Sequence, residues 1–238
     1  MQRKIALVTG AAKGIGKSLI TELAKNGYDV VINYLSSEKL AMKLKKEVEE
    51  KYNVKALTYK CDVTNELEVI KMIDEVKDVF GKIDILINNA AFASDNYLVD
   101  KTKEEFMRVL EVNLVGPFLV SKYASKYMDN GVIVNISSKD AISTYNEISI
   151  DYCASKAGLN SLTKTLSLAI KNNKVIAVMP GWVETESVKE MNPDYLKSEL
   201  ERINQKKLAT PLGIVNQIIN VINDKSIKTG SIIELDDE

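Results

Sequence analysis

The chain has 238 residues, 45% of them hydrophobic, and its 32 basic and 33 acidic residues leave a formal net charge of −1. This balance argues against a nucleic-acid surface or a charged tail. The sequence contains no histidine, which excludes Ser-His-Asp hydrolysis, Cys-His proteolysis and histidine-ligated zinc. No metal site is expected.

The two cysteines, Cys61 and Cys153, are too few for a disulfide framework and fit a reducing compartment. No apolar run approaches the roughly 20 residues needed to span a bilayer. The first residues begin a strand directly and leave no room for a signal peptide. We therefore expect a cytoplasmic protein that binds no membrane.

Short β-rich runs alternate with longer segments of helical period along the chain. Strands are predicted at residues 4–8, 29–33, 54–61, 83–88, 132–137, 174–179 and 231–235. Helices are predicted at residues 14–26, 37–52, 66–80, 102–127, 152–169 and 211–223. A capping box at Thr102 and Glu105 should start the fourth helix, and Gly116-Pro117 should kink it.

Strands that alternate with helices imply right-handed crossovers and a parallel sheet. We predict the α/β class, with a single doubly wound Rossmann-type domain over residues 1–238. Its mostly parallel seven-stranded sheet should carry helices on both faces, because most strands are continuous apolar runs. The polar segment at about 181–208 follows the carboxyl end of a strand, which favours a substrate lid.

The stretch TGAAKGIG, residues 9–16, lies between the first strand and the first helix. Its glycines permit a tight turn and let a pyrophosphate approach the amides at a helix N-terminus. The alternative is a glycine turn needed only for tight packing. Its place after the first strand favours phosphate binding.

Tyr152 and Lys156 are four residues apart, so they share one face of their predicted helix. A phenol with a pKa of about 10 is a poor acid near neutral pH. A nearby ammonium group favours the phenolate and lowers that pKa. The pair is therefore the candidate proton carrier of a chain without histidine, and the alternative is an exposed helical pair without function. Cys153 points about 100° away around the helix and is interpreted as a packed residue.

Further motifs follow in order at the predicted strand ends and on the helices: CDVT at 61–64, NNA at 88–90, VNLVGPF at 112–118, VNISS at 134–138, YCASK at 152–156 and PGWVET at 180–185. Together with the glycine turn they resemble the short-chain dehydrogenase/reductase family over residues 4 to 235. The resemblance implies that Tyr152 is the general acid of carbonyl reduction, and that Lys156 tunes it and holds the nicotinamide ribose. It also implies that Ser138 binds the substrate carbonyl and that Asn113 holds a water in the proton relay. Ser138 lies fourteen residues before Tyr152, against a usual thirteen, so the extra residue is assigned to loop 139–150, with Ser137 as the fallback.

The same resemblance implies a bound dinucleotide. No carboxylate occurs at the end of the second strand before Glu38, whereas Lys13 is basic and Ser36 and Ser37 could donate to a 2′-phosphate. NADP(H) is therefore expected in preference to NAD(H). The expected cofactor-binding residues are Gly10, Lys13, Gly14, Ile15, Gly16, Asn33, Ser36, Ser37, Asp62, Val63, Asn89, Ala90, Tyr152, Lys156, Pro180, Gly181, Val183 and Thr185.

Within the family the chain looks most similar to 3-oxoacyl-[acyl-carrier-protein] reductases. That implies an NADPH-dependent ketone reductase of small carbonyl compounds or acyl thioesters, with a role in fatty acid biosynthesis and an acyl carrier protein as candidate partner. Departures at Ala91 and Asp129 keep an NADP-linked sugar, polyol or small-alcohol dehydrogenase open. A non-catalytic dinucleotide-binding regulator is the third hypothesis. Family dimer contacts fall on helices 102–127 and 152–169, so a homodimer or homotetramer is expected.

Overall fold

The structure, a computed structural model, describes residues 3–236 and contains a seven-stranded sheet in the order β3-β2-β1-β4-β5-β6-β7. Every pair of neighbouring strands is parallel, so the predicted mostly parallel sheet is parallel throughout. The strands are β1 Ile5–Val8, β2 Asp29–Tyr34, β3 Ala56–Lys60, β4 Ile85–Asn88, β5 Val132–Ile136, β6 Lys174–Met179 and β7 Ile232–Glu234.

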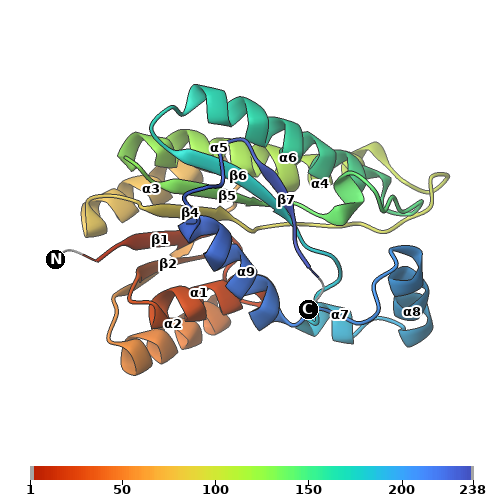
Figure 1. The fold of residues 1–238 in the computed structure, drawn as a ribbon, viewed down its shortest axis with the longest axis horizontal. Coiled ribbons are helices and arrows are strands. Elements are labelled where there is room, and N and C mark those ends of the chain that lie inside the picture. Colours follow the sequence, from red (N-terminus) through yellow and green to blue (C-terminus); the bar gives the residue numbers. More distant parts are fainter. Residues whose placement is uncertain (1–2, 237–238) are drawn as a thin grey trace.

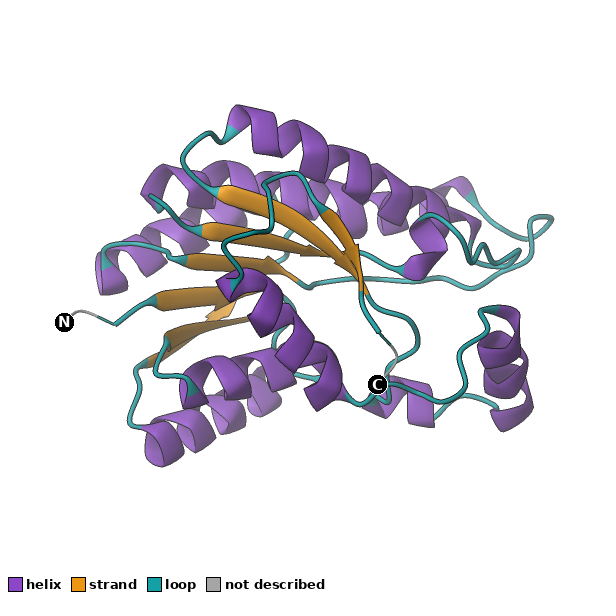
Figure 2. Ribbon diagram, viewed as in Figure 1, coloured by secondary structure: helices purple, strands orange, loops and turns teal. Residues whose placement is uncertain are grey.

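Helices cover both faces of this sheet, as Figure 2 shows with the helices in purple and the strands in orange. One face carries α1 Gly14–Lys25, α2 Glu38–Tyr52 and α9 Pro211–Asn223. The opposite face carries α3 Glu66–Phe80, α4 Lys103–Leu110, α5 Gly116–Ala124 and α6 Ile150–Ala169 (Figure 1). The predicted doubly wound Rossmann-type arrangement is confirmed.

The first strand explains why the sequence pattern is continuously apolar. Ala6 and Val8 pack into the core beneath α1, α2 and α9, whereas Ile5 and Leu7 pack into the core on the other face. All four side chains are at most 2% exposed. Successive residues of a strand point to opposite faces, so a strand covered on both sides needs apolar residues at every position.

The winding of the chain reverses at β1. Ala6 pairs with Val30 of β2 on one side and with Ile85 of β4 on the other. The chain thus builds β1, β2 and β3 in one direction and then crosses back to place β4 beside β1. In open α/β sheets, a crevice opens at the carboxyl ends of the strands at such a reversal.

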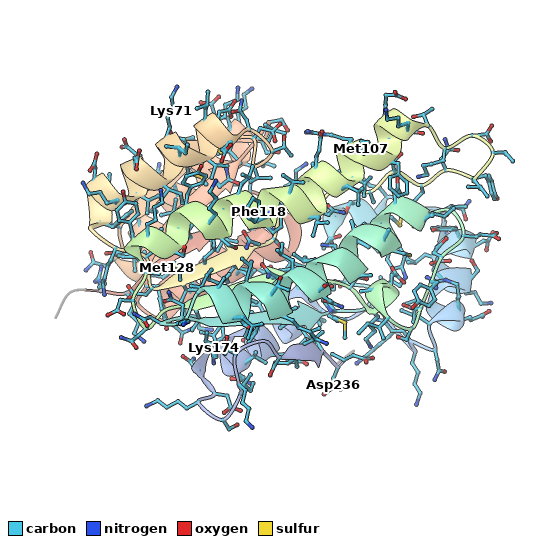
Figure 3. All side chains as sticks on the ribbon, turned by 90° about the horizontal axis from the view of Figure 1, so that it is seen from above. Lys71, Met107, Phe118, Met128, Lys174 and Asp236 are labelled. Carbon is cyan, nitrogen blue, oxygen red and sulfur yellow. The ribbon has the colours of Figure 1, made fainter. Side chains whose placement is uncertain are left out.

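The helix predicted at residues 102–127 is continuous in space but changes its winding. The Thr102–Glu105 capping box is present, and a π-helical turn, η1 Glu111–Val115, joins α4 to α5. Pro117 lies in the first turn of α5, where a missing amide donor is tolerated. The irregularity is therefore a π turn before the proline, and Figure 3 shows the rod running on from Met107 through Phe118.

The two ends of the segment 181–208 lie side by side. Val183 and Ala209 form an isolated parallel bridge, and between them lie α7 Glu186–Lys189 and α8 Pro193–Arg202. Both short helices lie beyond the end of the sheet toward which the strand arrows point (Figure 1). Among residues 3–236, no helix combines the length and apolar character needed to cross a membrane.

Candidate active site

Two adjoining cavities open where the parallel strands end. The larger, about 640 Å³, extends from the glycine turn to α7, and the smaller, about 310 Å³, lies between Tyr152 and Trp182. Ala91, Phe92 and Ser187 line both of them. The two volumes therefore share a boundary, as a cofactor and its reaction partner require.

The glycine turn forms one wall of the larger cavity. Gly10 and Gly14 have φ angles of 60° and 54°, a left-handed conformation that costs a side chain strain. A Cβ on Gly16 would lie 2.6 Å from the carbonyl oxygen of Gly10. Only glycine fits there. The amides at the start of α1 face the cavity, and they have no intrahelical partners because they belong to the first turn of a helix. This cradle fits the pyrophosphate of a dinucleotide.

Most of the predicted cofactor-binding residues meet in the larger cavity. Those that line it are Gly10, Lys13, Gly14, Ile15, Asn33, Ser36, Ser37, Asp62, Val63, Asn89, Ala90 and Thr185. Gly16 and Pro180 are buried, and the Val183 side chain packs in the core beneath α1 and α9. Gly181 and Tyr152 instead line the smaller cavity, and Lys156 is buried.

Two of the predicted contact residues brace the turn with their side chains. The Asn33 amide oxygen accepts from the Gly10 amide at 3.1 Å, and its nitrogen donates to the Cys61 carbonyl. The Asn89 side chain donates to the carbonyls of Thr9 and Gly10. These amide groups hold β1, β2 and β4 at fixed spacing, so their side chains shape the cavity through the backbone they support.

Three side chains from the glycine turn and from the end of β2 make few contacts within the protein. Lys13, the N-cap of α1, and Ser36, after β2, are exposed, and Ser37, the N-cap of α2, makes no side-chain capping bond. All three line the larger cavity. An ammonium group and two hydroxyls at a helix N-terminus form a donor set suited to a phosphate group.

Sequence reasoning missed Arg108 of α4. Its guanidinium group lies 3.3 Å from Asp62 and 3.2 Å from the Thr64 hydroxyl, at the wall of the larger cavity. The contact bridges more than forty residues of sequence, and nothing local to Arg108 indicates it. The ion pair fixes the loop after β3 against α4.

The smaller cavity contains the predicted proton-transfer group. Tyr152 lines it and is partly exposed there, and the Ser138 side chain is close enough to act on the pKa of its hydroxyl. Lys156 Nζ lies 5.4 Å from the centre of the Tyr152 ring and donates to the Ile136 carbonyl at 2.7 Å. The predicted pairing of Tyr152 with Lys156 is therefore present, and the ammonium group lies deeper than the phenol.

The two serines of the predicted pair differ in their contacts. The Ser137 hydroxyl is buried and donates to the carbonyl of Lys156, whereas the Ser138 side chain acts to lower the pKa of Tyr152. The loop after Ser138 contains a 3-10 turn, η3 Lys139–Ala141, within the segment assigned to the extra residue. The longer spacing between serine and tyrosine thus leaves their contact intact.

The electrostatics of the pair differ from the sequence expectation. Burial raises the pKa of Tyr152 above its ordinary value, and the Asp140 carboxylate raises it further. The Ser138 hydrogen bond acts in the opposite direction. Burial lowers the pKa of Lys156 to about 8. Desolvation therefore outweighs the attraction between ammonium and phenolate that the spacing alone suggests.

Asn113 occupies the π turn η1 and is fully buried. Its amide oxygen accepts from the Phe92 amide at 2.8 Å, while its nitrogen donates to the Phe92 carbonyl and to Ser155. Both amide hydrogens are thus used within the protein. The Asn113 side chain ties the segment that lines both cavities to the helix that carries Tyr152, and π turns often occur at functional sites.

A buried ion pair fixes the start of that helix. Lys101 lies 3.0 Å from Asp151, and their side chains are 5% and 0% exposed. The second Asp151 oxygen accepts from the Tyr152 amide at 2.9 Å. Leaving either charge unpaired in the interior would be costly, so the pair holds the loop after β4 and the first turn of α6 together.

The thiols of the two cysteines are not reactive groups of this site, although Cys61 lines the larger cavity. Both are free and buried. Burial raises the pKa of the Cys61 thiol to about 12, and burial also raises the pKa of Cys153. Neither thiol has the depressed pKa of a nucleophile, which supports the interpretation of Cys153 as a packed residue.

Comparison with known proteins gives a consistent result. The family profile described as short chain dehydrogenase matches residues 4–196. The 3-oxoacyl-[acyl-carrier-protein] reductase FabG of Staphylococcus epidermidis is 34% identical over 228 residues, covering 94% of this chain and 93% of its own. A short-chain dehydrogenase from Burkholderia cenocepacia in complex with NADP superimposes with a TM-score of 0.90 at 28% identity, covering 99% and 97% of the two chains. A dehydrogenase/reductase from Sinorhizobium meliloti gives a TM-score of 0.92 at 28% identity, covering 99% and 94%.

The buried lysine predicts a pH-dependent stability. With a folded-state pKa of about 8 and an unfolded value of about 10.4, Lys156 binds fewer protons when folded between these pH values. Stability contributed by this group therefore rises as pH increases through that window. We expect wild type to gain stability relative to Lys156→Met between pH 7 and pH 9.5 in urea titrations. For Lys164→Met, an exposed position of the same helix, the difference in free energy of unfolding from wild type should not change with pH. If the difference between wild type and Lys156→Met were also independent of pH, the lowered pKa of Lys156 would be contradicted.

Proposed function

Because the chain belongs to the short-chain dehydrogenase/reductase family, and so is an NAD(P)-dependent oxidoreductase acting on CH–OH and C=O groups, we propose that it is an NADPH-dependent ketone reductase. One observation carries the proposal. The Tyr152 side chain opens into a small cavity that adjoins a dinucleotide-sized one. Its relatives among the 3-oxoacyl-[acyl-carrier-protein] reductases favour an acyl thioester as substrate, an acyl carrier protein as partner and a role in fatty acid biosynthesis.

The residues would divide the chemistry between them. A bound NADPH supplies the hydride. Tyr152 donates its proton to the carbonyl oxygen, because its raised pKa keeps the phenol protonated until charge develops on that oxygen. The Ser138 hydroxyl, which donates to Asp140 in the structure, would turn its one hydrogen to the same oxygen and form a second hydrogen bond. Lys156, with a pKa of about 8, can return a proton to Tyr152 near neutral pH and can bind the nicotinamide ribose.

Asn113 acts through its surroundings in this proposal. Its side-chain donors are used by Phe92 and Ser155. A relay water would therefore bind to its backbone carbonyl, which lies in a π turn whose backbone hydrogen-bond pattern differs from that of the flanking α-helix. The side chain meanwhile keeps the Phe92 segment aligned with Tyr152.

Residues 181–208 serve as the substrate lid in this proposal. Trp182, Met191 and Tyr195 line the smaller cavity. Arg202 of α8 donates to the carbonyl of Tyr145 at 2.9 Å, and Asn146 donates to Glu199 of α8 at 2.9 Å. These contacts link the lid to the loop that follows Ser138, so α8 helps to enclose the reacting carbonyl.

One observation favours the alternative of an NADP-linked sugar, polyol or small-alcohol dehydrogenase. The smaller cavity is lined by polar side chains that can bind hydroxyl groups, among them Asp95, Asp140, Thr144 and Asn146. A hydroxylated ketone would find more partners there than a plain alkyl chain. A substrate panel that contains an acetoacetyl thioester and several keto-sugars distinguishes the two classes.

The general acid is the first test. Tyr152→Phe should lower turnover of a reduced ketone by about 10²–10⁴-fold, the usual contribution of a positioned proton donor. NADPH binding, measured by fluorescence titration, should be retained. The control is Tyr145→Phe, a 67% exposed residue of the neighbouring loop, which should keep wild-type turnover. An unaffected rate in Tyr152→Phe would rule out the mechanism, and NADPH binding by wild type without reduction of any ketone would favour the regulator.

The cofactor form is the second test. We expect NADPH to be used at a lower KM than NADH, because Lys13, Ser36 and Ser37 offer donors to a 2′-phosphate. Hydrogen bonds to a charged group contribute about 1.5–3 kcal/mol, so Lys13→Ala should raise the KM for NADPH about tenfold and leave that for NADH unchanged. Lys17→Ala, one turn further along α1, is the control. Equal use of both cofactors by wild type would contradict this preference.

We also propose a homo-oligomer, a dimer or a tetramer, in the cytoplasm. Large hydrophobic side chains are exposed along α4, η1, α5 and α6, with Met107 at 44%, Val115 and Phe118 at 41% each and Leu168 at 75%. Met107 and Phe118 lie on one rod in Figure 3. A second copy would cover this surface, and two free buried thiols suit a reducing compartment. Light scattering should give a mass of at least two chains, and a monomer at micromolar concentration would contradict it.

A further inference from the structure

The smaller cavity carries two carboxylates that the proposed mechanism does not use. Asp95, on the segment after β4, and Asp140, two residues after Ser138, both line it. The Asp95 carboxylate accepts from the Ser149 hydroxyl at 2.5 Å. Asp140 accepts from the Thr144 hydroxyl at 2.7 Å. Hydroxyl partners orient these carboxylates and leave their charge in place.

Two of the cations near the cavity, Lys139 and Arg202, are paired with other carboxylates. Lys139 lies 3.6 Å from Glu234 of β7. The Arg202 guanidinium lies 2.7 Å from the Glu199 carboxylate and 3.5 Å from that of Asp140, so its stronger contact is with Glu199. Lys156 lies beneath the Tyr152 ring and donates to the Ile136 carbonyl. The charged side chains that line the cavity are two carboxylates, Asp95 and Asp140, and one ammonium group, that of Lys139.

Asp140 is next to the reacting groups. Its amide donates to the Ser138 hydroxyl oxygen at 3.1 Å, and its carboxylate lies 3.4 Å from the same atom. Both Asp140 and Asp95 add to the burial effect that raises the pKa of Tyr152. The negative electrostatic field of these two carboxylates thus extends to the Tyr152 hydroxyl, which would contact a substrate carbonyl. In a partly enclosed cavity such a field is screened less than at an open surface.

We propose that Asp140 and Asp95 make this cavity select uncharged carbonyl compounds and reject those that carry a carboxylate next to the reacting ketone. The inference rests on the proposed function, since it assumes that the ketone binds beside Tyr152. Like charges placed close together cost binding energy. A 3-oxo ester, a 3-oxo thioester or a hydroxyketone fits this selection, whereas a 2-oxo or 3-oxo acid does not.

The fluorescence of Trp182 can be used to measure ligand binding in the smaller cavity. It is the only tryptophan of the chain and lines the smaller cavity, so its fluorescence reports binding there without turnover. Ethyl acetoacetate and acetoacetate form a matched pair that differs in the charge beside the ketone. Both are titrated into Tyr152→Phe with NADPH present, because this variant should consume the ketone about 10²–10⁴-fold more slowly than wild type.

We expect the ester to bind at least about tenfold more tightly than the acid. Adding Asp140→Asn, or Asp95→Asn, should reduce this ratio to about threefold or less by improving binding of the acid. The matched control is Asp129→Asn, because Asp129 is exposed and precedes β5 at the opposite edge of the sheet. It should leave the ratio unchanged.

Equal binding of acid and ester in the Tyr152→Phe protein would overturn the inference. So would a ratio that neither aspartate substitution changes. A separate measurement tests the proposed function. If the wild-type protein oxidised no NADPH with the ester or with any ketone of the panel, that function would be contradicted. The fluorescence ratio still decides the charge selection in that case, because it does not depend on turnover.

Discussion

The common direction of the strands is the constraint on which the site depends. Since all seven strands run parallel, every turn that follows a strand falls on one edge of the sheet. The glycine turn after β1, residues 88–90 after β4 and Ser138 after β5 meet there although 128 positions separate Gly10 from Ser138. The Thr9 hydroxyl accepts from the amides of Asn89 and Ala90 at 3.0 Å each, which joins β1 to β4 at the point where the winding reverses.

Buried polar side chains then fix the catalytic helix against this edge. Asn88 of β4 donates to Asn135 of β5 at 2.8 Å, Asn135 donates to Thr163 of α6 at 2.9 Å, and Thr163 donates to the Leu159 carbonyl. A polar group left unpaired in the interior costs more than the bond contributes. A shift of α6 along the sheet would break this chain of bonds, so the interior favours one position of the helix that carries Tyr152 and Lys156.

The sequence predicted those features that depend on local pattern, and it missed those that depend on contacts between distant segments. Apolar strands, the capping box at Thr102 and the glycine turn follow from neighbouring residues, and each is present. The π turn around Asn113 and the Lys101–Asp151 pair depend on α6, which begins some fifty residues after Lys101. The spacing of Tyr152 and Lys156 showed that they share a face, but it could not show how deeply Lys156 is buried. Burial, and therefore the direction of the Tyr152 pKa, is a property of the packed molecule.

The residues proposed for catalysis and for charge selection lie on parts of different rigidity. Tyr152 and Lys156 lie on a twenty-residue helix that is bonded to the sheet, and Ser138 is the second residue after β5. Asp95 and Asp140 lie on loops, and Asp140 also contacts the lid through Arg202. Loops accept substitution more readily than packed elements, and ligand contacts often lie on them for that reason. Under the proposed function, a change of loop charges would therefore direct the same reaction to another class of carbonyl compound, while the proposed proton donor and its lysine keep their positions.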